Sequence, residues 1–557
     1  MPEWLVARIK TAQTTTHSNT TNAPGWADPL VHGVAEGCRD DTCWRLIRRY
    51  AAMRPVLSKD EVLGFMLAWA RGCDPEFPEA DAREKVERAF TEMHTSLVDL
   101  PLTDAGNAER MIALYGDRFR WATDREEWLA WDGQRWARGS AEVVKGLALD
   151  VARLTQGGAI RLDTEARPKG QTTKRAILKH TLYAESARGI ANAVQVAKVL
   201  PSVWVEGRAL DSRPDLLNVA NGTLDLRTFE LRAHDPRDLL TRVIKVPYEP
   251  TAGAPLWQRF LEDVFCGRQD VIEYVQRAVG YTLTGSITEQ CFFLLHGSGA
   301  NGKSTFVGVL TALMADYATK VEQEAILVPD RRGRGATPEL VVFVGKRFAY
   351  VDELEEGRQL DEARVKALTG SERGTGRALY EGMREWTNTA KLWLDLNHLP
   401  TFTGVDYGIE RRPRVIPFDR RFEDHEQDRT MLDRLKAELP GVLAWAVAGC
   451  KAWRQRGLDA PEVVSLATRR YRDENNHLPA FMEDLYVKRP GASVAVGALK
   501  QEYRGWCAGR DESPLDYQRK VVPFLEQAWK LTRKRVHGGS FVWTGLAQRV
   551  NPGEPQT

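Results

Sequence analysis

Eight residues from Gly297 to Ser304 have the types and spacing of a phosphate-binding loop. They read GSGANGKS, which fits the pattern G-x-x-x-x-G-K-[ST]. The glycines let the backbone wrap a polyphosphate with its N–H groups pointing inward, Lys303 can reach the β and γ phosphates, and the Ser304 hydroxyl can ligate Mg²⁺. A Gly-rich turn can match by chance, but the apolar runs 291–295 and 306–314 supply the strand and helix that the motif requires. The sequence therefore predicts a site for ATP and Mg²⁺ that comprises Gly297, Ser298, Gly299, Ala300, Asn301, Gly302, Lys303, Ser304 and Thr305.

A pair of acidic residues follows a second apolar run, 347–351. Carboxylates at the end of a buried strand beside a phosphate loop can orient Mg²⁺ and activate the attacking water. We assign Asp352 to the metal and Glu353 to the general base. Because Glu355 and Glu356 come next, the alternative is a solvated acidic turn, and the preceding phosphate loop favours the catalytic interpretation.

A polar residue ends a third apolar run, 391–396, and two arginines come soon after it. Asn397 can hold the lytic water or touch the γ-phosphate, although asparagine in a loop is more often a turn residue. Arg411 and Arg412 precede the apolar segment 415–418, and one of them can reach a neighbouring subunit's γ-phosphate. The alternative for this pair is an ordinary arginine pair at the surface.

These residues require a parallel sheet with covering helices. Residues 291–418 alternate strand, loop and helix, as in an α/β core, and helix continues to about 453. Upstream, apolar residues recur at helical spacing between about 42 and 90. Residues 102–290 are mixed, with a hairpin turn expected at Asp132-Gly133. We expect the tryptophans at 121, 128, 131 and 136 to build the core, with base stacking as the alternative. The polar segment 11–24 predicts a disordered tail, and the basic stretch 166–175 predicts an exposed loop.

A small basic module is expected at the C-terminal end, from 459 to 548. Helices are predicted near 463–471, 494–506 and 515–529, followed by strands 531–536 and 541–543 around a Gly-Gly turn. Arg533, Lys534 and Arg535 lie in the first strand, where a hairpin can follow a phosphate backbone. The alternative is a solvated basic edge strand, whose charges prevent aggregation.

Composition sets the class of protein. The chain has 557 residues, 43% of them hydrophobic, a mean hydropathy of −0.41 and a net charge of only +2. Nucleic-acid contacts must therefore come from local basic patches. The 7 cysteines are scattered without zinc-ligand spacing, which favours a reducing cytoplasm. We see neither a signal peptide nor an apolar run long enough to span a membrane.

The order of motifs resembles superfamily 3 helicases, specifically the phage and plasmid primase-helicase family related to the poxvirus primase-helicase. The motor segments that carry the likeness are GSGANGKST, RFAYVDELEEG, VKALTGSERGTGRALYEG, LDLNHLP and GVDYGIERRPRVIPF. Upstream, LTDAGNAERMIALYGDRFRW and LLNVANGTLDLRTFEL are similar to the domain that precedes the motor, and EGCRDDTCWRLIRRY to a helical module that follows primase domains.

The resemblance implies an AAA+-type P-loop ATPase core with helical and mixed N-terminal domains and a C-terminal winged helix. The expected parts are a disordered tail (1–27), a post-primase helical module (28–98), a mixed α/β domain (102–290), the motor (291–453) and the winged helix (459–548). The family implies a hexameric ring with ATP sites between subunits, translocating on single-stranded DNA, usually 3′ to 5′, and opening forked DNA in the cytoplasm of a bacterial host cell. By position, Arg412 is the likeliest finger with Arg411 beside it, and Lys366, Arg377 and Arg384 are the cations of the pore-hairpin motif.

The sequence also departs from the family. Glu410 stands where an aromatic residue is common, Pro413 follows the arginine pair, and the expected hairpin turn near Glu381-Gly382 lacks a basic tip. No catalytic primase domain is evident, so we expect a helicase without primer synthesis, and a separate primase or polymerase is a candidate partner. The main alternative is an ATP-regulated DNA-binding initiator or assembly switch without processive unwinding. A small-molecule kinase is a poorer alternative, since it leaves the basic C-terminal module unexplained.

Overall fold

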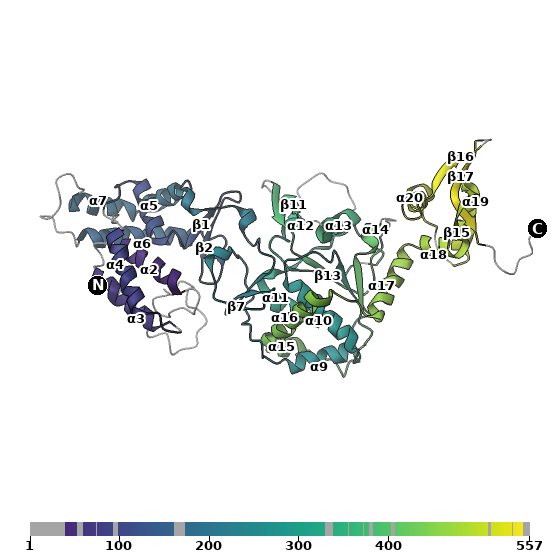
Figure 1. Ribbon diagram of the computed structural model, residues 1–557, viewed down its shortest axis with the longest axis horizontal. Helices are drawn as coiled ribbons and strands as arrows, with labels where there is room; N and C mark the ends of the chain where they lie inside the picture. The colour runs from purple at the N-terminus through teal and green to yellow at the C-terminus, as the bar shows by residue number, and fades with distance from the viewer. Residues whose placement is uncertain are drawn as a thin grey trace, which may run out of the picture. The chain divides into compact units, whose positions relative to one another are not determined.

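The chain forms two compact units, residues 1–248 and 249–557, in the computed structural model (Figure 1). The structure describes residues 39–52, 59–73, 75–92, 99–160, 173–328, 338–354, 356–370, 373–377, 383–402, 407–510, 514–536 and 539–549. The predicted tail and most of the basic stretch 166–175 lie outside these residues.

The first unit begins with a helical bundle. Its helices are α2 (Arg39–Ala52), α3 (Lys59–Arg71), α4 (Glu79–Glu92), α5 (Asp104–Tyr115), α6 (Ala141–Ile160), α7 (Lys174–Ala184) and α8 (Ala187–Ala197). Val62, Met66 and Trp69 are buried on one face of α3, at the predicted helical spacing. The same apolar core includes residues of α5, α6 and α8, so the segment 28–98 does not have a core of its own in the described structure.

A four-stranded sheet lies next in this unit, in the order β3-β2-β1-β4. Its strands are β1 (Phe119–Ala122), β2 (Glu127–Trp131), β3 (Trp136–Ala137) and β4 (Trp204–Val205). The hairpin predicted at Asp132-Gly133 is confirmed, since Trp131 pairs with Trp136 and Gly133 has a φ of +102°. Trp128 and Trp136 are buried, as predicted for core residues, whereas Trp121 and Trp131 are half-buried.

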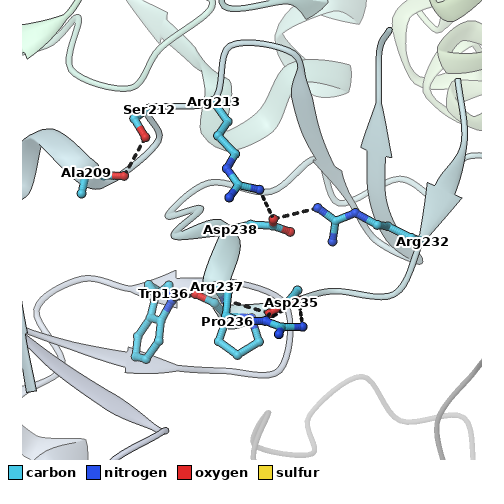
Figure 2. A network of polar contacts seen from close by, with 9 residues as sticks. All are labelled: Trp136, Ala209, Ser212, Arg213, Arg232, Asp235, Pro236, Arg237 and Asp238. Carbon is cyan, nitrogen blue, oxygen red and sulfur yellow. Dashed lines mark hydrogen bonds and ion pairs between the residues drawn. The ribbon is translucent and has the colours of Figure 1, made fainter. Parts of the chain in front are cut away.

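Three antiparallel strands, β5 (Leu216–Val219), β6 (Gly222–Asp225) and β7 (Leu231–Arg232), form another sheet of this unit, and Arg232 belongs to a polar network shown in Figure 2. The buried Asp238 carboxylate accepts hydrogen bonds from Arg213 at 3.0 Å and Arg232 at 2.7 Å. The Trp136 indole donates to the Pro236 carbonyl at 2.8 Å. These bonds fix the segment after β7, because a buried carboxylate is stable only when it is paired.

The second unit contains a five-stranded parallel sheet in the order β14-β8-β13-β10-β9. Its strands are β8 (Phe292–His296), β9 (Ala318–Lys320), β10 (Phe348–Asp352), β13 (Lys391–Leu396) and β14 (Pro413–Pro417). The helices α11 (Lys303–Met314), α12 (Pro338–Val341), α13 (Glu362–Gly370) and α14 (Tyr407–Glu410) connect or flank them. β13 is buried along its whole length, as expected for a strand inside a parallel sheet. This confirms the α/β core predicted for 291–418.

Helix α10 (Gln269–Leu283) packs on α9 (Pro255–Val264) and α16 (Leu439–Arg456), and α11 packs on α16 and α15 (Met431–Lys436); these helices lie together in Figure 1. α10 and α16 cross closely, since a Cβ added to Gly280 would lie 2.0 Å from the Cys450 nitrogen. At the base of the sheet, the buried Arg347 and Lys391 donate to the last carbonyls of α10, where the helix dipole favours a cation. The boundary between the two units, at residues 248 and 249, lies before α9 and earlier than the predicted position at 290.

Two further elements of this unit accompany the parallel sheet, a hairpin and a helix. An antiparallel hairpin comprises β11 (Arg373–Arg377) and β12 (Met383–Thr387), and its tip lies outside the described residues. Helix α17 (Glu462–Asn475) packs on β14, because the Val415 N–H donates to Thr468 Oγ1 at 3.0 Å. α17 is thus part of the α/β core and not of the C-terminal module that we predicted from 459.

The C-terminal module contains α18 (Leu478–Leu485), β15 (Tyr486–Ala495), α19 (Val496–Ala508), a π-helical turn (Tyr517–Val521), α20 (Val522–Gln527), β16 (Thr532–Arg535) and β17 (Phe541–Gln548). The sheet order is β15-β17-β16, around a core that includes Trp543 and Phe481. The helix predicted over 515–529 is interrupted, and Pro523 lies in the first turn of α20. β15 was not predicted, because its Pro490-Gly491 pair interrupts the alternating pattern.

Two general expectations are tested by the described residues. All six cysteines within them are free thiols. No helix in that part of the chain is both long and apolar enough to cross a membrane.

Candidate functional site

The loop between β8 and α11 has the backbone that its glycines predict. Gly299 and Gly302 have φ angles of +94° and +83°, in the left-handed region that glycine adopts without cost. Ala300 lies in the same region, with a φ of +48°. A Cβ on Gly302 would lie 2.8 Å from the Val264 side chain, and one on Gly297 would lie 2.4 Å from the Phe418 carbonyl oxygen. The glycines therefore allow both the turn and its close packing against the core.

The Lys303 ammonium lies inside this loop and is nearly fully buried. It donates to the Gly297 carbonyl at 2.8 Å and to the side-chain oxygens of Asn301 and Asn397, both at 3.1 Å. Burial lowers the pKa of Lys303, and the nearby Asp395 carboxylate opposes this shift. The contact with Asn397 brings the end of β13 to the phosphate loop, where the sequence placed a polar sensor.

Asp395 is a member of this site to which the sequence analysis gave no role. Its Oδ2 accepts a hydrogen bond from Ser304 Oγ at 2.9 Å, and its Oδ1 lies 3.8 Å from Lys303 Nζ. Burial raises the pKa of the Asp395 carboxyl, while the Ser304 hydrogen bond and the Lys303 charge lower it, and Asp352 and Glu353 raise it. An acidic residue within the otherwise apolar run 392–396, two residues before Asn397, was the signal available in the sequence.

Asp352 and Glu353 lie at the same edge of the sheet and are exposed. Asp352 is the register partner of Asp395 on the neighbouring parallel strand and forms an ion pair with Lys320 at 2.9 Å. Glu353 has a φ of +49°, a strained conformation for a residue with a Cβ, and its N–H donates to the Asp395 carbonyl. A hollow beside them is lined by Lys320, Val321, Glu322, Gln323, Asp352 and Glu353.

The oxygen donors at this edge suit Mg²⁺, which prefers hydroxyl, carboxylate and water oxygens. The Ser304 hydroxyl and the carboxylates of Asp352 and Asp395 belong to this class, and Lys303 supplies the charge for a polyphosphate. The residues present therefore fit a magnesium nucleotide.

The two arginines expected at a subunit interface differ in exposure. The Arg412 side chain is buried and donates to the Gly408 carbonyl at 2.6 Å and to Thr369 Oγ1 at 2.8 Å. Arg411 is exposed and its guanidinium contacts the Gln290 side chain. These contacts within its own chain make the Arg412 guanidinium less available to a neighbour's phosphate than that of the exposed Arg411.

The candidate DNA-contacting cations lie on separate elements. Lys366 is half-exposed on α13, and Arg377 and Arg384 lie on the paired strands β11 and β12, with Arg384 opposite Gly376. The side chains of these two arginines and the expected turn at Glu381-Gly382 lie outside what the structure describes.

The basic strand of the C-terminal module is β16. Arg533, Lys534 and Arg535 on this strand are all exposed, and Arg533 lies over the Phe541 ring at 4.9 Å. β16 is an edge strand, since β17 lies between it and β15.

A phosphate loop at the carboxyl edge of a parallel sheet, facing an acidic pair and a polar strand end, is the arrangement of a P-loop α/β core.

Comparison with known proteins identifies proteins that are similar to this chain. Residues 108–266 match the family described as "D5 N terminal like". A protein of Acanthamoeba polyphaga mimivirus named "Putative helicase" is 26% identical over 54% of this chain and 33% of its own length. A "Putative helicase" of Frog virus 3 is 24% identical over 69% of this chain and 40% of its own length.

Primase D5 of Fowlpox virus is 26% identical over 27% of this chain and 19% of its own length. Among solved structures, the apo NrS-1 C terminal region aligns with 79% of this chain and 99% of that chain, at a TM-score of 0.46 and 10% identity. The chain thus contains a D5 N terminal like domain and is a distant homologue of these viral helicase and primase proteins. It spans two fifths or less of the length of these curated relatives.

Proposed function

We propose that this chain is an ATP-driven DNA helicase of the superfamily 3 type, with an AAA+ motor and a C-terminal winged helix. The observation that carries the proposal is the hydrogen bond from Lys303 to Asn397 at 3.1 Å. It places the phosphate loop and the polar end of β13 at one point, next to the strand that ends in Asp352 and Glu353. Phosphate binding, metal binding and water activation then share one edge of the sheet.

Each side chain has a distinct role in this proposal. Lys303 moves from its loop partners to the β and γ phosphates, Asn397 orients the γ-phosphate or the water, and Glu353 accepts the proton of the attacking water. Bound Mg²⁺, held through Ser304 and Asp352, supplies charge neutralisation of the phosphates. The exposed Arg411 supplies the remaining positive charge to the ATP of the next subunit in a hexameric ring.

The remaining proposals concern DNA. A single strand in the ring, tracked 3′ to 5′, would contact the cations at 366, 377 and 384, and the C-terminal module would hold the duplex of a fork. The strong salt dependence of such phosphate contacts makes them measurable.

The function is tested with a radiolabelled forked duplex and purified full-length chain. We expect ATP-dependent release of one strand and an ATPase rate that rises several-fold with single-stranded DNA. Filter binding without strand release would instead favour the initiator or assembly switch. An ATPase rate indifferent to DNA would contradict a translocating motor.

Neutralising Arg533, Lys534 and Arg535 together with alanine should weaken duplex binding and leave the basal ATPase rate unchanged. Each lost phosphate contact makes the negative slope of log K against log salt shallower by about 0.9, so the three together make it shallower by up to about 2.7. The measurement is a salt titration of duplex affinity by fluorescence anisotropy.

A matched control removes three exposed cations elsewhere, Lys451, Arg469 and Arg470. This variant should keep the wild-type slope. If the β16 variant also keeps the wild-type slope and affinity, the basic strand serves protein contacts or solubility.

A further inference from the structure

Asp395 is the most buried acid at the nucleotide site and is bonded to the residue that the phosphate loop offers to a metal. We propose that Asp395 is the principal protein carboxylate for the divalent cation at this site and acts together with Ser304. The proposal rests on the proposed function, since it concerns the metal that accompanies the nucleotide. The position of Asp352 at the end of β10 suggests that Asp352 is the main ligand of the metal, and the proposal assigns this role to Asp395 instead.

The first argument is geometric. Mg²⁺ binds oxygen at 2.0–2.1 Å in an octahedral arrangement, so two adjacent ligand oxygens lie about 2.9 Å apart. Ser304 Oγ and Asp395 Oδ2 are separated by 2.9 Å. The two oxygens thus already have the spacing of neighbouring ligands, and rotation of the hydroxyl hydrogen is the only change that coordination requires of this pair.

The second argument follows from the charges around Asp395. Its nearby partners are the Ser304 hydroxyl and the Lys303 ammonium, 3.8 Å away. When a magnesium nucleotide binds in the proposed way, Lys303 would turn to the phosphates and the Ser304 hydroxyl hydrogen would turn away from Asp395. A buried carboxylate that loses such partners is strongly destabilised unless another cation replaces them. A divalent cation bound to Asp395 supplies that replacement.

The third argument compares the two acids. Asp395 and Asp352 are register partners, so they lie on the same face of neighbouring strands. β13 is adjacent to β8, the strand that leads into the phosphate loop, whereas β10 is one strand farther away. Asp352 is about half exposed and already paired with Lys320 at 2.9 Å. Asp395 is therefore the nearer carboxylate and the one with greater need of a cation.

The test measures metal binding directly, with Mn²⁺ as a paramagnetic probe. Free and bound Mn²⁺ are distinguished by electron paramagnetic resonance in the presence of a non-hydrolysable ATP analogue. Binding of a fluorescent ATP analogue in EDTA reports nucleotide affinity without metal. The variants are Asp395→Asn, which keeps the shape and removes the charge, Asp352→Asn for comparison, and Asp433→Asn as a control on an exposed acid of α15.

Asp395→Asn should raise the Kd for Mn²⁺ by at least about tenfold, as expected when a metal site loses a ligand or its support, and leave nucleotide affinity in EDTA within about twofold. Asp352→Asn should have a smaller effect on Mn²⁺, and Asp433→Asn none. Ser304→Ala should also weaken Mn²⁺ binding, and the double variant with Asp395→Asn should lose less than the two single losses combined, because both residues serve one ion.

Three outcomes overturn the metal assignment alone. Wild-type Mn²⁺ affinity in Asp395→Asn, with loss in Asp352→Asn, assigns the metal to Asp352. If Asp395→Asn loses as much nucleotide affinity in EDTA as it loses Mn²⁺ affinity, Asp395 only positions Lys303. Full additivity with Ser304→Ala shows that the two residues do not share an ion. If the wild-type chain binds no ATP analogue with or without metal, the proposed function fails and this assignment fails with it.

Discussion

Arg411→Ala protein should bind ATP with wild-type affinity and hydrolyse it about 10³-fold more slowly, the smaller of the losses known for arginine fingers. Arg411 is exposed next to β14, and its contact with Gln290 leaves it at the surface of its own subunit. In the proposed ring, an arginine at this exposed position would meet the ATP of a neighbouring subunit. The measurements are ATP affinity by fluorescence titration and turnover at saturating ATP and single-stranded DNA.

Mixing variants tests whether the arginine acts between subunits. Arg411→Ala subunits keep an intact phosphate loop, and Lys303→Ala subunits keep an intact arginine. Rings that contain both should regain part of the activity at interfaces that combine the two intact groups. If the mixture stays inactive while each variant still assembles, the trans model is wrong.

Arg412→Ala is the matched control for this prediction. Removing its guanidinium leaves Thr369 Oγ1 and the Gly408 carbonyl without this donor, so we expect a lower Tm, since unsatisfied buried groups are costly. Rescue of Arg412→Ala by Lys303→Ala subunits, without rescue of Arg411→Ala, would restore the original choice of Arg412.

Local sequence was sufficient for the parts of the site that depend on neighbouring residues. The glycine spacing from Gly297 to Gly302 determines the loop, and the apolar runs on either side determine β8 and α11. The apolar runs ending at Asp352 and Asn397 indicated two more strands. Because the carboxyl ends of parallel strands share an edge of the sheet, these residues could be placed together without coordinates.

Contacts between distant segments were not predictable in this way. The buried Arg412 guanidinium donates a hydrogen bond to Thr369, 43 residues earlier in the chain. The membership of α17 in the α/β core depends on its packing against β14 and on bonds such as the one between Thr468 and Val415. Asp395 lies within an otherwise apolar strand, and the arrangement of β13 beside β8 brings it to Ser304. Periodicity describes each element by itself and leaves such partners undetermined.

Glu353→Gln protein should bind ATP normally and hydrolyse it about 10²- to 10⁴-fold more slowly, the range expected for loss of a general base. The amide keeps the size of the side chain but cannot accept the proton of the attacking water. The strained φ of +49° at Glu353 and its N–H bond to the Asp395 carbonyl hold the residue at the end of β10. Binding is measured with a fluorescent ATP analogue, and hydrolysis by phosphate release.

Two variants complete this experiment. Glu322→Gln removes another exposed carboxylate from the same hollow and should leave turnover unchanged. Lys303→Ala should abolish hydrolysis, because the charge that develops on the phosphates is left uncompensated. Wild-type turnover in Glu353→Gln would show that this carboxylate is not the base. Equal loss in Glu322→Gln would mean that the net charge of the hollow, and not proton transfer at Glu353, controls the rate.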